Sequence, residues 1–223
     1  MLKLTDIHFS FGSKVILSGL SIDFNPGQVT GIVGKNGVGK TTLFRIMSGI
    51  YKLQQGKITN NEKTLQPSDI SFMPTEPYFY PYMKGEEYLD IVANSAEEKK
   101  LSQSYAKSLE LPLNELVDNY STGMRKKLAF SALFALSRPV IILDEPYNGV
   151  DLESNEMIKH IIHTHHTDKI VILSSHILST VTDISQQIYH ITEGGMVSLF
   201  LSDQFSALEK RLMLDVQARK SAI

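Results

Sequence analysis

The segment that most constrains the fold of this chain is a glycine-rich loop at residues 34–42. The apolar run 29–33 before it is typical of a buried parallel strand, and the periodic run 43–47 after it indicates a helix. The spacing fits G-x-x-x-x-G-K-[ST], in which backbone N–H groups and a helix start surround a polyphosphate. An ordinary glycine-rich turn is the alternative, and both flanks disfavour it. We therefore expect a nucleoside triphosphate to bind Gly34, Lys35, Asn36, Gly37, Val38, Gly39, Lys40, Thr41 and Thr42, with Mg²⁺ on the Thr41 hydroxyl.

Composition narrows the class of protein. The chain has 223 residues, of which 42% are hydrophobic and 21% charged, as is ordinary for a globular protein with one core. A net charge of −2 gives no sign of a nucleic-acid partner. Cysteine is absent and no secretory signal is recognisable, which suits a reducing cytoplasm. No apolar run approaches the roughly 18 residues of a spanning helix, so any membrane crossing is expected from a partner.

The order of predicted elements indicates an α/β fold. Two alternating segments, 2–9 and 15–24, predict antiparallel strands ahead of the loop. Strands at 56–58, 68–74, 140–143 and 169–174 and helices at 152–164 and 177–184 predict a mainly parallel sheet, followed by a hairpin at 187–201 and an amphipathic helix at 203–219. Helical patterns at 86–93, 96–109 and 122–136 interrupt this alternation and predict a small all-helical subdomain.

Two carboxylates, Asp144 and Glu145, directly follow the apolar run 140–143. Open α/β sheets bind ligands at the carboxyl ends of their strands, so both are expected at the phosphate site. Mg²⁺ would compensate the buried charge of Asp144, and Glu145 can polarise the water that attacks the γ-phosphate. An exposed acidic turn is the alternative. His176 ends the next predicted strand, where it could sense the γ-phosphate, although a lone histidine is more often structural.

Polar residues also open the predicted helix at 122–136. Ser121 or Thr122 could serve only as its N-cap. Alternatively, Ser121 and Gly123 could form a second anion site at a helix N-terminus. The string alone does not decide between the two.

Together, these motifs resemble the ATP-binding cassette (ABC) family, in particular the stand-alone ATP-binding subunit of bacterial export-type transporters. The order is phosphate loop, connector, signature at 120–124, Asp144-Glu145, residues 148–151 and then His176. The resemblance spans nearly the whole chain. It implies one ABC ATPase domain over 1–223, with a P-loop NTPase (RecA-like) core lobe at 1–76 and 137–223 and a helical lobe at 77–136. It also implies head-to-tail pairing, in which the signature of one cassette closes on the ATP of the other.

The resemblance assigns roles to single residues. Glu145 corresponds to the catalytic glutamate, His176 to the switch histidine and Asp144 to the Walker B aspartate that holds Mg²⁺ with Thr41. Asp151 corresponds to the D-loop aspartate, and Phe11 replaces a tyrosine that stacks on adenine. No guanine-binding N/T-K-x-D motif is present, which favours ATP.

Two departures from the family pattern stand out. The signature is YSTGM where the family has LSGGQ, but Ser121 and Gly123 are kept. After Pro74 the family usually has a glutamine, whereas this chain has Thr75 and then Glu76. We expect Glu76 to replace that glutamine as a metal ligand, or else the positioning of Mg²⁺ and water to be altered.

The expected function is an ATP-binding and ATP-hydrolysing subunit that powers a membrane transporter, in the export direction by analogy. The expected partners are a second copy or a paralogous cassette and separate transmembrane permease subunits. These would hold the protein on the cytoplasmic face of the cell membrane, with no nucleic acid involved. One alternative is a soluble cassette ATPase acting on ribosomes or DNA. The other is a regulatory module that binds ATP with little turnover, against which Glu145 argues.

Two further segments have two interpretations each. The aromatic run 78–83 predicts either core of the helical lobe or anchors for a permease. His160, His163, His165 and His166 could suggest a metal site, but no carboxylate or cysteine completes a ligand set. A solvated helix end is the favoured interpretation of the histidines.

Overall fold

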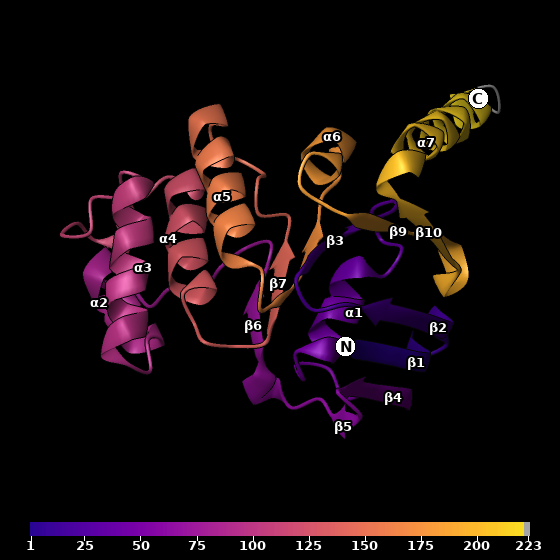
Figure 1. Cartoon of the computed structure of the whole chain (residues 1–223), viewed down its shortest axis with the longest axis horizontal. Helices are drawn as coiled ribbons and strands as arrows, with labels where there is room; N and C mark the ends of the chain where they lie inside the picture. The colour runs from indigo at the N-terminus through magenta and orange to yellow at the C-terminus, as the bar shows by residue number, and fades with distance from the viewer. Residues whose placement is uncertain (221–223) are drawn as a thin grey trace.

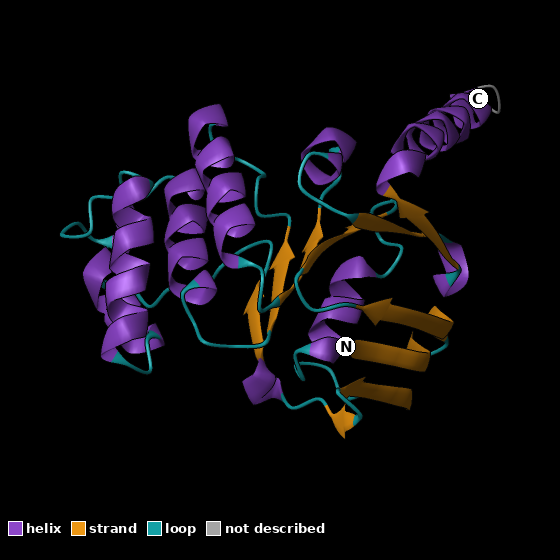
Figure 2. Cartoon of the chain, in the orientation of Figure 1, coloured by secondary structure: helices purple, strands orange, loops and turns teal. Residues whose placement is uncertain are grey.

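The computed structural model describes residues 1–220, which form two β-sheets with helices packed around them (Figures 1 and 2). The smaller sheet is antiparallel and comprises β1 (Leu2–Phe11), β2 (Lys14–Phe24), β4 (Gln55–Asn60) and β5 (Lys63–Thr64). Its strand order is β2-β1-β4-β5. The antiparallel pairing of β1 with β2 confirms the sequence prediction, while the two-residue β5 was not predicted.

The larger sheet has six strands in the order β10-β9-β3-β8-β7-β6. They are β3 (Gln28–Val33), β6 (Ile70–Met73), β7 (Val140–Asp144), β8 (Ile170–Ser174), β9 (Gln187–Ile191) and β10 (Val197–Leu201). All neighbouring pairs are parallel except β9 and β10, which form the predicted hairpin around a short 3₁₀ turn at Glu193–Gly195. The predicted mainly parallel α/β fold is confirmed.

The central strands of the larger sheet are covered on both faces. This burial explains the continuously apolar sequence at residues 140–143 of β7. Val140 and Ile142 pack into a cluster with the antiparallel sheet and α1 (Lys40–Met47), which lies between the two sheets. Ile141 and Leu143 point to the opposite face and join the core beneath the other helices. Successive residues of a strand face opposite ways, so a strand buried on both sides must be apolar at every position.

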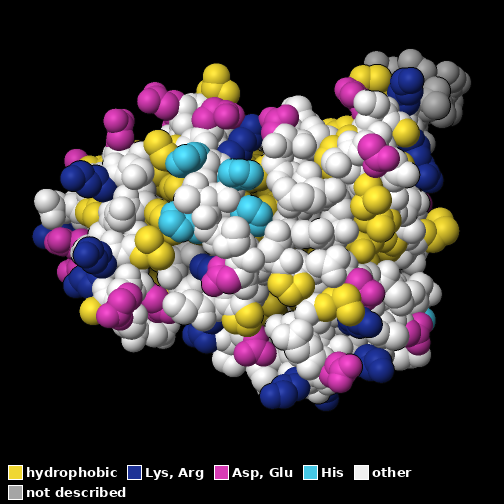
Figure 3. All heavy atoms as spheres, in the orientation of Figure 1, with side chains coloured by type: hydrophobic (Ala, Val, Ile, Leu, Met, Phe, Trp, Pro, Cys, Tyr) yellow, Lys and Arg dark blue, Asp and Glu magenta, His cyan; other side chains and the backbone are white. Residues whose placement is uncertain are grey.

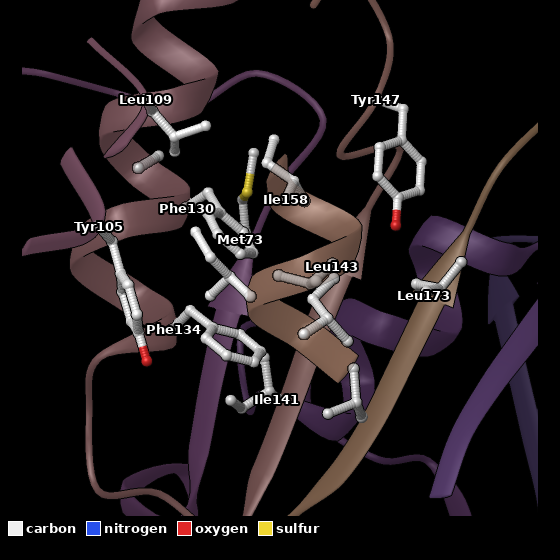
Figure 4. Packing of buried hydrophobic residues seen from close by; sticks show 14 of the residues in the cluster. Met73, Tyr105, Leu109, Phe130, Phe134, Ile141, Leu143, Tyr147, Ile158 and Leu173 are labelled. Atoms are coloured by element: carbon white, nitrogen blue, oxygen red, sulfur yellow. The ribbon is translucent and has the colours of Figure 1, made fainter. Parts of the chain in front are cut away.

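The second face of the sheet supports the helices near the signature. Phe130 and Phe134 of α4 stack at 5.1 Å between ring centroids and belong to the same cluster as Ile141 and Leu143 (Figure 4). Since this core continues from the sheet into the helices, the division into lobes at 77–136 stays a prediction. The helices on this side are α2 (Gly85–Val92), α3 (Ala96–Ser108), α4 (Thr122–Phe134) and α5 (Leu152–His165).

Two more helices follow β8. These are α6 (Leu178–Thr182) and α7 (Phe205–Lys220), the second of which extends away from the sheets at the C-terminal end (Figure 1). Leu208 anchors the start of α7 in the main core. Within residues 1–220, no helix combines the length and the apolar character needed to cross a bilayer.

The stacked phenylalanines supply a direct test of this core. Phe130→Ala should lower the free energy of unfolding by about 3–5 kcal/mol, because a fully buried ring is replaced by a cavity. The measurement is equilibrium unfolding in urea. Tyr82→Ala is the control, since this side chain is 83% exposed and its loss should change stability by less than about 0.5 kcal/mol. Equal effects of the two variants would contradict the packing described.

Candidate nucleotide site

An open cavity of about 700 Å³ lies at the carboxyl ends of β3, β7 and β8. It brings together the phosphate loop, both carboxylates of the Asp144-Glu145 pair and His176, which the sequence placed at one sheet edge. Its wall consists of Phe11, Lys14, Ile16, Asn36, Gly37, Gly39, Lys40, Thr41, Thr42, Thr75, Asp144, Glu145, Asn148 and His176.

The loop forms a cradle whose shape depends on glycine. Gly39 is the N-cap of α1 at φ 113°, and a Cβ there would lie 3.0 Å from Ile16 Cγ2, so backbone strain and crowding both exclude a side chain. Lys40 Nζ donates to the carbonyl oxygens of Gly34 at 2.8 Å and Lys35 at 3.2 Å, which holds the ammonium over the loop. Burial lowers the pKa of Lys40, while the charges of Glu145 and Asp144 oppose that shift.

Not every loop residue lines the cavity. Gly34 and Lys35 contribute the carbonyl groups that hold Lys40, and the Lys35 side chain lies 3.9 Å from Glu193. Val38 is buried beneath the loop in the core around α1. The predicted nucleotide contacts of these three residues stay predictions.

Asp144 is the buried centre of the site, with 1% of its surface exposed. Its Oδ2 accepts hydrogen bonds from the hydroxyls of Thr41 at 2.7 Å and Thr75 at 2.9 Å. Its Oδ1 accepts from Ser174 Oγ at 2.6 Å, because the β7–β8 register sets the two residues side by side. Buried polar oxygens need such hydrogen-bond partners, because leaving them unpaired is costly.

These oxygens fit Mg²⁺. A carboxylate and hydroxyls are hard oxygen ligands, and Mg²⁺ typically takes one or two protein carboxylates and completes its shell with phosphates and water. In keeping with this, residues 1–220 contain no group of three or more His, Cys, Asp or Glu side chains that could hold a metal alone. Thr41 and Asp144 are the residues that would hold the ion.

Glu145 adopts an unusual backbone conformation at the mouth of the cavity. Its φ is 54°, in the left-handed region that a non-glycine residue seldom occupies. The carboxylate Oε2 accepts hydrogen bonds from His176 N at 3.2 Å and lies 2.7 Å from His176 Nδ1. Strained residues of this kind are found at functional sites where surrounding contacts hold them. Glu145 and His176 thus act as a pair.

Phe11 stands at the outer end of the cavity. Its ring is 48% exposed and packs edge-on against Phe9 at 5.0 Å and Tyr51 at 5.6 Å between centroids. These contacts fix the ring at the cavity wall, and its stacking on adenine stays a prediction.

The signature residues lie outside this cavity. Ser121 caps α4 by accepting a hydrogen bond from Met124 N at 3.2 Å, which matches the simpler of its two interpretations. A Cβ on Gly123 would lie 2.6 Å from the carbonyl oxygen of Gly149, so α4 and the 148–151 loop touch closely. Asp151 caps α5, and hydrogen bonds from Ser154 lower its pKa. A nucleotide bound in this cavity therefore does not reach Ser121, Gly123 or Asp151 of the same chain.

The structure does not bring Glu76 to the cavity wall. Its side chain is exposed, whereas the neighbouring Thr75 reaches Asp144. Thr75 therefore occupies the place expected for Glu76, and metal binding by Glu76 stays an untested prediction that the geometry does not favour.

Several residues in or beside the cavity wall carry no motif signal in the sequence. Ser174 meets Asp144 through the β7–β8 register, whereas Thr75 reaches Asp144 from just beyond the end of β6. Lys14 and Ile16 reach the cavity from β2, far from the loop in sequence. A short polar residue at the end of a buried strand, as at Ser174, was the one available hint.

Four histidines lie in α5 and directly after it, and histidine side chains gather on the face of the molecule shown in Figure 3. His160, His163 and His165 are exposed, as expected for a solvated helix end. His166 is buried, and its Nδ1 lies 2.8 Å from the His163 carbonyl oxygen, so that interpretation is wrong for this residue. His165 packs against the Tyr105 ring at 5.6 Å.

Comparison with known families decides the identity of this site. The family model described as "ABC transporter" matches residues 17–148, which contain both the phosphate loop and the Asp144-Glu145 pair. The chain belongs to the ABC transporter ATP-binding family. It is an ATP-binding subunit with the ATPase fold and activity of that family, and the predicted resemblance is confirmed.

Relatives carry matching names. An uncharacterised ABC transporter ATP-binding protein of Bacillus subtilis, YdbJ, is 30% identical over 100% of this chain and 76% of its own length. The lantibiotic transport ATP-binding protein SrtF of Streptococcus pyogenes is 28% identical over 88% of this chain and 89% of its own. The cobalt import ATP-binding protein CbiO of Salmonella typhimurium is 26% identical over 89% and 80%.

Solved structures show the same fold. An ATP-binding subunit of an ABC transporter superposes with a TM-score of 0.84 at 22% identity, covering 92% of this chain and 91% of that one. A dimeric cassette in a post-hydrolysis state bound to ADP and Pi gives 0.78 at 20% identity, covering 91% and 99%. The α/β cassette fold is thereby established for this chain.

Proposed function

We propose that this cassette hydrolyses ATP between two copies, or between one copy and a paralogous cassette, to drive a membrane exporter. The observation that carries the proposal is that its anion-binding groups are divided between two places. The cavity holds Lys40 and the backbone of Gly37 and Gly39, whereas Ser121 and Gly123 lie outside it at the start of α4. Head-to-tail pairing would bring the signature of one copy onto the nucleotide of the other.

The chemistry follows from the residues of the cavity. Backbone N–H groups of the loop and the Lys40 ammonium bind the phosphates, and the Phe11 ring stacks on the adenine. Glu145, oriented by its contact with His176, accepts the proton of the attacking water. Thr41 and Asp144 would hold Mg²⁺, which would neutralise charge on the phosphates. In this arrangement Asp151, the N-cap of α5, would contact the partner cassette.

A surface for the membrane partner lies on the connector after β6. Tyr78, Tyr80 and Tyr82 are all more than 60% exposed, whereas Phe79 between them packs at 4.6 Å on Tyr88. Of the two interpretations of this run, anchors for a permease therefore fit the three tyrosines and core packing fits Phe79. Binding there would hold the cassette on the cytoplasmic face of the cell membrane.

The export direction rests on analogy. SrtF serves lantibiotic transport, but CbiO, at similar identity, serves cobalt import. In everted membrane vesicles, an exporter would take up transported compounds when ATP is added outside. Release from preloaded vesicles on addition of ATP would instead establish import.

Affinity purification from detergent-solubilised membranes tests the transporter assignment. We expect a multi-spanning membrane protein to copurify with the chain. The double variant Tyr78→Ala/Tyr80→Ala should lower that yield about tenfold while ATP binding is unchanged, since exposed aromatic anchors dominate such interfaces. Recovery of ribosomes or DNA in place of a membrane protein would overturn the assignment.

A further inference from the structure

A buried lysine connects the signature helix to the Glu145 backbone. Lys126 lies on α4, five residues after Ser121, and is only 3% exposed. Its Nζ donates a hydrogen bond to the Glu145 carbonyl oxygen at 2.8 Å. Arg125 and Lys127, its neighbours in sequence, make their contacts elsewhere, Arg125 with the Asp118 carbonyl group and Lys127 with Ser154.

This contact completes the set of bonds around a strained residue. The Glu145 N–H donates to Ser174 Oγ at 3.1 Å, and its carboxylate is held by His176. On the carbonyl side, Asn148 N approaches at 3.3 Å and Lys126 Nζ at 2.8 Å. A non-glycine residue at φ 54° persists only where the surroundings hold its backbone, and the charged donor makes the shorter of the two carbonyl contacts.

The surroundings explain why a charge is tolerated at this depth. An ammonium removed from water is costly unless it is paired and hydrogen-bonded. Burial lowers the pKa of Lys126, while the charges of the nearby Glu145, Asp144 and Glu76 carboxylates oppose that shift. Leu128 and Ala129, the next buried positions of α4, are apolar, so packing alone does not call for a lysine here.

We propose that Lys126 is a positioning residue, which holds the Glu145 backbone in place and transmits the position of α4 to the catalytic carboxylate. The inference rests on the proposed role of Glu145 and on nucleotide contact at the start of α4. When Ser121 and Gly123 engage the nucleotide of the partner cassette, a movement of this helix is passed directly to Glu145 through the Lys126 hydrogen bond. The rate of hydrolysis would thus depend on whether Ser121 and Gly123 contact the nucleotide of the partner cassette.

Lys126→Met tests the proposal, because methionine fills the space without donating a hydrogen bond. We expect kcat to fall about tenfold to 100-fold, as for a misplaced catalytic group, while KM and ATP affinity stay within about twofold. Lys126→Gln keeps an N–H donor and should restore part of kcat. Lys169→Met is the matched control, since this half-buried lysine also donates to backbone carbonyl groups, at Phe134 and Leu136 near the other end of α4.

The proposal is overturned if Lys126→Met keeps the wild-type kcat. It is equally overturned if Lys126→Gln restores nothing, or if Lys169→Met lowers kcat as much, since either result indicates a general packing defect. Glu145→Gln in the same assay distinguishes the proposed role of Glu145 from the positioning role of Lys126. If that variant hydrolyses ATP normally, the proposed role of Glu145 fails. If it is inactive while Lys126→Met is fully active, only the positioning role fails.

Discussion

Glu145→Gln is expected to bind ATP normally and to lose hydrolysis by about 10²–10⁴-fold, the usual contribution of a general base. The amide keeps the shape of the side chain but cannot accept the proton of the attacking water. The Lys40 and Thr41 contacts with nucleotide are untouched, so ATP should remain bound. Phosphate release at saturating ATP measures the first effect, and equilibrium binding of a fluorescent ATP analogue measures the second.

Glu97→Gln is the control for this substitution. Glu97 is exposed in the first turn of α3, far from the cavity in the fold, and the change removes the same charge. Its turnover should equal that of the wild type. If Glu145→Gln also retained wild-type turnover, the general base would have to be another group.

Lys40→Ala is expected to weaken ATP binding by at least about 100-fold, or roughly 2.7 kcal/mol. The ammonium is the positive side chain held over the phosphate loop, and hydrogen bonds to charged groups contribute about 1.5–3 kcal/mol each. Isothermal titration with ATP and Mg²⁺ measures the change. Lys57→Ala on the exposed surface of β4 should bind as the wild type does.

A second variant separates the ammonium from the packing of its aliphatic stem. Lys40→Ala and Lys40→Met both remove the hydrogen bonds to the Gly34 and Lys35 carbonyl oxygens, but only Lys40→Ala also empties the space that the stem fills. Lys40→Met retains most of the stem and should bind ATP as poorly as Lys40→Ala while unfolding at the wild-type temperature. ATP affinity within twofold of the wild type in both variants would contradict the assignment of the loop.

Much of the fold and site could be predicted because the key residues follow buried strands. The loop follows β3, Asp144 ends β7 and His176 follows β8, and parallel strands bring their carboxyl ends to one edge. The position of each residue relative to its own strand was therefore enough to predict that they meet in space. Most element bounds differ from the predicted ones by one or two residues, as at the end of α4, where the helix stops at Phe134.

The remaining contacts depend on tertiary register, which spacing along the chain does not contain. Thr75 reaches Asp144 in the place expected for Glu76, because it is the residue nearer the end of β6. Ser174 meets Asp144 through strand pairing, and Lys126 meets Glu145 through the packing of α4. Lys126 is the middle residue of the basic run 125–127, and nothing in that run distinguishes it from its neighbours, although it alone of the three is buried.

The central claim, that ATP joins two cassettes, is tested most directly by the molar mass of Glu145→Gln in solution. Light scattering after size exclusion should give twice the 25.0 kDa chain mass in ATP and Mg²⁺, and 25.0 kDa in ADP. Removing the proton acceptor stops the reaction that would separate the pair, so the closed form should accumulate. A 25.0 kDa species with ATP bound would contradict the claim.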